Sequence, residues 1–210
     1  MKKNIKKFFV LSFIFLFSIQ IFYLIIEPTV TIAAAVTDNV IVTLTVDSGI
    51  TITSPADVTM APNLGIATNS SIGTAIWNVK TNRATGYTLG VQASSAPALV
   101  SGVNSFADFQ VTPVVWSLPA TSYQFGYSAF GTNTATATWG TGANCGSSGT
   151  PTATLKYRGF TTSSNTIATQ ATVTSPSGVD TTVCFAAGQN GVYAPSGVYT
   201  ATITATATEI

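Results

Sequence analysis

The chain has no histidine, only 7 % charged residues and two cysteines among 210 residues. The absence of histidine removes the usual general base, the usual zinc ligand and the usual pH switch. Eight basic residues stand against seven acidic ones, so there is no positive surplus to neutralise nucleic-acid phosphates. The acidic residues are scattered singly, without paired carboxylates or an Asp/Asn calcium loop. We therefore expect no catalytic residues, no metal site and no cofactor.

The first residues predict export. Lys2, Lys3, Lys6 and Lys7 precede an apolar run over residues 8–26, which is typical of a signal peptide. Ala33 and Ala35 occupy the two small-residue positions before a signal-peptidase cut after Ala35. A retained membrane anchor stays open, because the run is about 19 residues long and roughly 20 span a bilayer. In both cases residues 1–35 are the signal or anchor helix, and the chain after Glu27 lies outside the membrane.

The remaining residues 36–210 are predicted to form one all-β domain. Apolar and polar residues alternate with period two, most cleanly over residues 40–46, 87–93, 123–129 and 199–207. Clusters of Gly, Pro, Asn and Ser separate such runs at residues 81–86, 141–144, 175–178 and 195–197. One apolar and one Thr-rich face per strand indicate a single antiparallel β-sandwich, immunoglobulin-like or pilin-like, of roughly eight to ten strands.

The last alternating run leaves two arrangements open. Tyr199, Ile203 and Ala207 lie on its apolar face, and five threonines lie on the other. This face has to be buried, either against the rest of the same sandwich or as a strand donated to a second copy. The turn at residues 195–197 favours a return to the same sheet.

Cys145 and Cys184 are expected to form a disulfide. Both follow the export signal, so both meet an oxidising environment. The alternative of two unpaired thiols stays open at this point. Two thiols without a histidine are too few ligands for a structural metal.

Three aromatic residues are candidates for a ligand platform. Trp139 ends an alternating run and precedes a Gly-rich loop, so its indole is the best candidate for an exposed surface, with Tyr123 and Tyr127 beside it. Trp77 and Trp116 lie among apolar neighbours and are expected to be buried. Lys156 and Arg158 alternate with Leu155 and Tyr157, which predicts an ordinary solvated face for the two cations.

Several short motifs resemble secreted bacterial surface β-sandwiches. They are Trp77-Asn78-Val79, Gly86-Tyr87-Thr88-Leu89 and the run 197–203. The pattern is most similar to WxL cell-wall domains and, more loosely, to spore-coat U and pilin-type subunits. Trp116-Ser117-Leu118 matches the WxL motif literally, but the final run has Thr204-Ala205-Thr206 where that family carries a second tryptophan motif. The resemblance implies a sandwich fold and a surface location.

Two functions follow from these observations. The first is a non-enzymatic structural or adhesive protein of the cell envelope, which contacts wall polymer, glycan or other surface proteins. The second is a carbohydrate-binding module that uses the aromatic platform around Trp139. In both cases the protein is extracellular or on the cell surface, does not bind nucleic acid, and meets the membrane only through its N-terminal segment.

Overall fold

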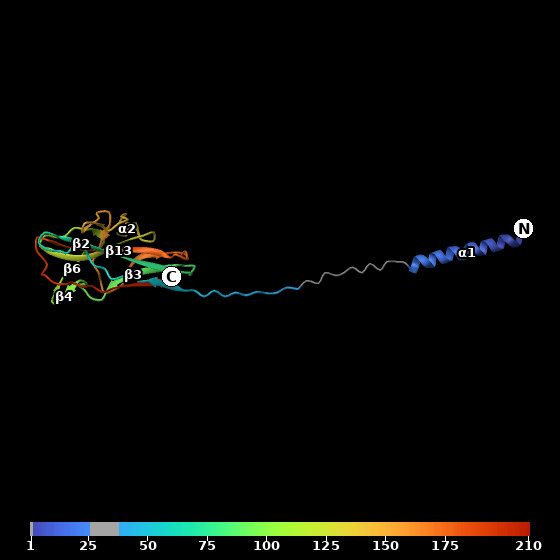
Figure 1. Cartoon of the computed structure of the whole chain (residues 1–210), viewed down its shortest axis with the longest axis horizontal. Helices are drawn as coiled ribbons and strands as arrows, with labels where there is room; N and C mark the ends of the chain where they lie inside the picture. The colour runs from blue at the N-terminus through green and yellow to red at the C-terminus, as the bar shows by residue number, and fades with distance from the viewer. Residues whose placement is uncertain (1, 26–37) are drawn as a thin grey trace. The chain divides into compact units, whose positions relative to one another are not determined.

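The computed structural model describes residues 2–25 and 38–210 (Figure 1). Contacts divide the chain into one unit that ends at Thr45 and a second unit, Val46–Ile210. The first unit contains helix α1 (Lys2–Ile25), which includes residues 8–25 of the apolar run predicted over residues 8–26. Within the described residues, none of the helices has the length and apolar character needed to cross a bilayer. The predicted cleavage residues Ala33 and Ala35 lie outside the described residues.

The second unit is built mainly from strands, as predicted. Its largest sheet has the order β1-β2-β13-β8-β6. All neighbouring pairs are antiparallel except β6 and β8, which are parallel. The strands are β1 (Ile50–Thr53), β2 (Ser70–Thr81), β6 (Ala107–Asp108), β8 (Ser122–Phe130) and β13 (Val179–Asn190).

A second sheet has the order β12-β3-β14, with β3 (Tyr87–Ala93) between β12 (Asn165–Gln170) and β14 (Ile203–Glu209). Three short two-stranded pieces and one helical turn, α2 (Thr136–Trp139), complete the unit. The short strands are β4 (Val100–Ser101), β5 (Asn104–Ser105), β7 (Val114–Val115), β9 (Gly146–Ser147), β10 (Thr150–Pro151) and β11 (Lys156–Tyr157).

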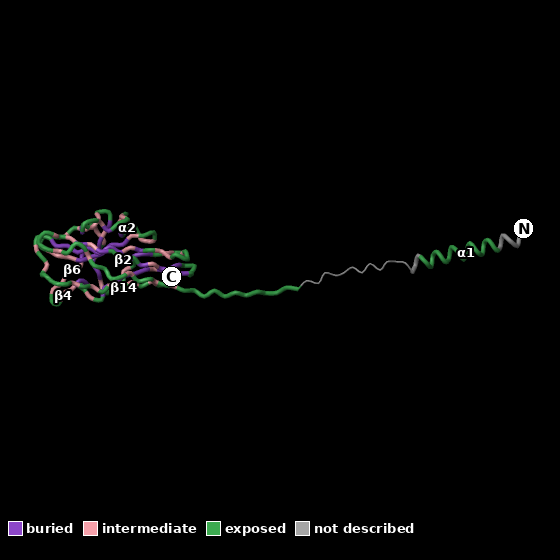
Figure 2. The backbone as a smooth tube through the Cα atoms, viewed as in Figure 1, coloured by how far each residue is buried: buried purple, intermediate pink, exposed green. Residues whose placement is uncertain are grey.

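The main core is formed by side chains from both larger sheets. Leu89 and Val91 of β3 and Val183 of β13 are completely buried in it. Alternation explains which residues point inward, because successive side chains of a strand face opposite sides of the sheet. Figure 2 shows the buried segments running along these strands.

The strand β13 explains why the architecture is more than the single antiparallel sandwich that we predicted. Val183 and Phe185 face the main core, whereas Cys184 and Ala186 face a second cluster with Leu155 on the other side of the sheet. A sheet that is apolar on both faces needs cover on both faces. The all-β class is therefore confirmed, but the strands are divided among several sheets, and loops and short strands cover the second face of the largest one.

The final strand belongs to its own fold. β14 pairs antiparallel with β3 along its whole length, from Ile203 opposite Ala93 to Glu209 opposite Tyr87. Ile203, Ala205 and Ala207 pack against the main core as half-buried side chains, and the threonines between them are exposed. The structure thus has the intramolecular arrangement rather than a donated terminal strand.

The strand predicted over residues 40–46 is wrong. Residues 38–49 contain no strand, and Val42 and Leu44 are exposed. The reason is the lack of a neighbour, because β1 begins at Ile50 opposite Thr81, which is the last residue of β2. Asn82 extends the pairing slightly, since its side chain accepts from the Gly49 N–H at 2.7 Å and donates to the Asp47 carbonyl at 2.8 Å.

Candidate functional site

The predicted aromatic platform is not on the surface. Trp139 is 2 % exposed and Tyr127 is fully buried, and their ring centroids lie 5.4 Å apart. Tyr123 is half-buried, with its ring edge-to-face against Phe106. The expectation of an exposed platform is therefore corrected. The cause is local: α2 turns the Trp139 indole inward, and the alternation of β8 places Tyr127 on the core face.

The other two tryptophans are packed among apolar side chains. Trp77 is buried in the main core, as predicted. Trp116 is half-buried, so the expected burial is partial. Its ring stacks on Phe109 at a centroid distance of 4.5 Å and meets Tyr157 edge-to-face at 5.5 Å. These contacts make Trp116 part of the cover over the second face of the largest sheet.

The disulfide between Cys145 and Cys184 is present, as predicted, with a Cα–Cα distance of 5.2 Å. It fastens the loop that contains Cys145 to the central strand β13. The Tyr157 hydroxyl donates to the Cys145 carbonyl at 3.2 Å, and the Thr74 hydroxyl donates to the Cys145 sulfur at 3.2 Å. Burial raises the pKa of Tyr157 far above its ordinary value, so the phenol remains a hydrogen-bond donor.

Lys156, Arg158 and Tyr127 form a polar group beside α2, which we call the cationic cluster. Tyr127 of β8 and Arg158 lie directly opposite each other and exchange two backbone hydrogen bonds of 2.8 Å. Directly opposed residues in a ladder point their side chains to the same face, and so do residues two apart in a strand. All three side chains therefore share one face of the sheet.

The polar atoms of the cationic cluster are incompletely paired. The Lys156 ammonium donates to the Ala137 carbonyl at 2.9 Å. Among the residues that the structure describes, the Tyr127 hydroxyl and the Arg158 Nε are buried without a hydrogen-bond partner. Burial raises the pKa of Tyr127 to about 12, although the positive charge of Arg158 acts in the opposite direction. The phenol is therefore protonated at neutral pH and keeps its O–H donor.

Sequence reasoning missed this cluster. The alternation of Lys156 and Arg158 with Leu155 and Tyr157 predicts a solvated face, but both cations are half-buried. The missing information was the position of α2 and the pairing of Arg158 with Tyr127, which lies 31 positions earlier in the chain. Neither feature can be predicted from the alternation of residues 155–158 alone.

The acidic residues that the structure describes form no metal-binding cluster. Across residues 2–25 and 38–210, no three cysteine or acidic side chains gather closely enough to hold a metal ion. The Asp108 carboxylate accepts from the Ala98 N–H at 3.1 Å, and burial raises the pKa of its carboxyl. This hydrogen bond ties the carboxyl of β6 to the residue two positions before β4.

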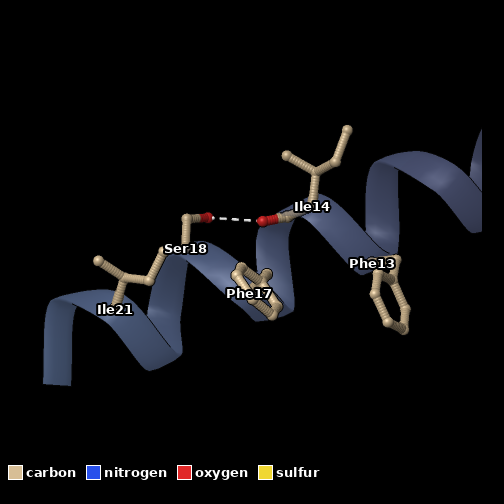
Figure 3. A pocket seen from close by; sticks show the side chains of 5 residues that line it. All are labelled: Phe13, Ile14, Phe17, Ser18 and Ile21. Atoms are coloured by element: carbon tan, nitrogen blue, oxygen red, sulfur yellow. Dashed lines mark hydrogen bonds between the residues drawn. The ribbon is translucent and has the colours of Figure 1, made fainter. Parts of the chain in front are cut away.

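The hollows of the surface are shallow. One runs along α1 between Phe13, Phe17 and Ile21, where the Ser18 hydroxyl donates to the Ile14 carbonyl at 2.8 Å (Figure 3). It follows from bulky side chains on a single helix and contains one polar side chain. A second hollow separates residues 55–59 from β2 and contains the Asp57 carboxylate. Neither hollow brings several polar groups together at depth, which is the usual mark of a small-molecule site.

We call the second unit, Val46–Ile210, the strand unit. The cationic cluster is its best candidate for a ligand-binding site, because it combines two cations with a buried hydrogen-bond donor. Its members are fixed by β8, by the segment that follows β11, and by α2. Comparisons with protein-family models, with characterised proteins and with solved structures found no match to this chain.

Proposed function

We propose that the protein is an exported, non-enzymatic structural or adhesive component of the cell envelope. The observation that carries this proposal is the buried disulfide that joins the loop containing Cys145, which we call the covering loop, to Cys184 of β13. Disulfides of this kind form and persist outside the reducing cytosol. The lysines and apolar run at the N-terminus supply a route of export to such a compartment.

The surface of the strand unit supports a contact role. Thr204, Thr206 and Thr208 form an exposed row on β14, opposite the half-buried apolar row of the same strand. Hydroxyl groups on a rigid sheet present donors and acceptors to polar polymers without a deep pocket. We propose that such faces contact wall polymer, glycan or other surface proteins, and that the two larger sheets act as the layers of a sandwich-like module.

The alternative of a carbohydrate-binding module depended on the aromatic platform. Stacking on a sugar ring requires an accessible aromatic face. Trp139 and Tyr127 are buried against each other, so these two residues offer no accessible ring face for this alternative. The structural or adhesive role is the one that we propose.

Sedimentation with envelope material tests this function. We expect the purified full chain, held in non-ionic detergent, to pellet saturably with envelope fragments from cells that produce it. The matched control is the same folded protein centrifuged without envelope fragments, which is expected to stay in the supernatant. A folded protein that stays in the supernatant at every fragment concentration would contradict the contact role.

A further inference from the structure

We infer that Arg158, Lys156 and Tyr127 form a binding site for an oxyanion group, a phosphate or a carboxylate. The site lies beside α2, where Tyr127 of β8 pairs with Arg158, the residue that follows β11. The site itself does not depend on the proposed function. The assignment of the oxyanion to an envelope polymer does rest on that function.

The first argument is the charge of the cluster. Lys156 and Arg158 carry like charges on the same face, two residues apart, so their Cα atoms lie about 6.6 Å from each other. Both side chains are half-buried, which removes part of the water that stabilises their charges. In the described residues, no hydrogen bond joins either side chain to a carboxylate, and the ammonium donates to a neutral carbonyl. A bound anion would supply the missing counter-charge.

The second argument is the buried hydroxyl of Tyr127. Its side chain is fully buried, and its oxygen has no partner among the described residues. A buried polar group without a partner destabilises the fold, so an unused donor at such a position needs a reason. The hydroxyl shares a face with Arg158, whose Nε–H is likewise buried and unused. The two donors come from segments 31 positions apart in the sequence and lie on one face of the sheet.

The geometry of these donors suits an oxyanion. A guanidinium presents N–H groups as a planar fork, which matches two oxygens of one carboxylate or phosphate. The Lys156 ammonium has three donors and gives one of them to Ala137, so two are left. The tyrosine adds a neutral donor at the buried end. Charge-assisted hydrogen bonds of about 2.7–2.9 Å from all three groups would then surround the ligand.

The number of arginines in the chain allows a direct test. Arg83 and Arg158 are its two arginines, so the Nε–H region of a nitrogen–proton correlation spectrum contains two side-chain signals. Arg83 is an internal control, because it is exposed and its Nε–H points to Thr85 and the Ile210 carbonyl. The full chain in non-ionic detergent is titrated with inorganic phosphate and with acetate at constant ionic strength, and Arg83→Lys assigns the signals.

We expect the Arg158 signal to shift saturably with phosphate, acetate or both, and the Arg83 signal to shift weakly and linearly. The anion with the tighter curve identifies a phosphate-bearing or a carboxylate-bearing polymer as the natural source. Lys156→Gln is expected to weaken binding on the order of tenfold. Its matched control Lys80→Gln changes an exposed lysine on β2 and should leave the curve unchanged.

Tyr127→Phe separates binding from folding. It removes a hydroxyl that has no partner in the protein, so the variant should unfold at the same temperature as the parent or slightly above it. It should nevertheless weaken anion binding by about three- to tenfold. Two results would overturn the inference: equal, linear shifts of Arg83 and Arg158 with both anions, or a saturable curve that neither Lys156→Gln nor Tyr127→Phe changes. Neither result changes what the sedimentation experiment with envelope fragments would show. The anion site and the proposed function are therefore tested independently.

Discussion

Replacing Cys145 and Cys184 together by alanine is expected to lower the free energy of unfolding by about 4 kcal/mol. The bridge joins residues 39 positions apart, and closing a loop of this length removes conformational entropy from the unfolded chain. The cost is large because a domain of this size is stabilised by about 5–15 kcal/mol in total. Urea unfolding of the double variant and of the parent, at equal protein concentration, measures the difference.

A control separates the bridge from the contacts around it. Thr74→Val removes the hydroxyl that donates to the Cys145 sulfur and leaves the covalent bond in place. It should cost about 1 kcal/mol. If the double alanine variant unfolds at the urea concentration of the parent, the bridge does not hold the covering loop as described.

Trp139→Ala is expected to destabilise the strand unit by about 3–5 kcal/mol. The indole is fully packed against Tyr127 in the main core, so its removal loses apolar burial and leaves a cavity. Thermal unfolding followed by circular dichroism measures the loss. An indole on an exposed platform would give the opposite result, a variant as stable as the parent.

Two variants calibrate this measurement. Trp139→Phe keeps an aromatic ring in the same place and should cost clearly less than the alanine variant. Tyr193→Ala truncates an aromatic side chain that is 60 % exposed and should change stability by less than about 0.5 kcal/mol. Equal losses for Trp139→Ala and Tyr193→Ala would contradict the buried position of the indole.

Local alternation was sufficient to predict the strand class and several strands. The apolar rows at residues 87–93, 123–129 and 199–207 correspond to β3, β8 and the segment that contains β14. Each row has a hydrogen-bonded partner strand and turns its apolar face toward the main core, so local pattern and tertiary structure agree. The disulfide was predictable as well, because the chain has two cysteines in total and both follow the predicted export signal.

The sequence predictions are wrong where a residue's structure depends on contacts with residues far away in the chain. Residues 40–46 have the same alternation as β3, but β2 ends opposite the first residue of β1, and none of the described strands pairs with residues 40–46. Pattern alone cannot supply this partner. The Gly-rich loop after Trp139 favours an exposed indole, whereas α2 turns this indole toward Tyr127. The division into several sheets likewise follows from β13, whose apolar residues occupy both faces.

The most direct test of the proposed function is the accessibility of Lys80 on intact cells. Lys80 is exposed on β2, and a membrane-impermeant, amine-reactive biotin reagent modifies it if the strand unit lies outside the membrane. Mass spectrometry of the same sample, digested without reduction, reports whether the peptides of Cys145 and Cys184 are joined. We expect biotin on Lys80 of intact cells together with the joined peptides. Labelling of Lys80 only after lysis, together with two free thiols, would contradict an exported envelope protein.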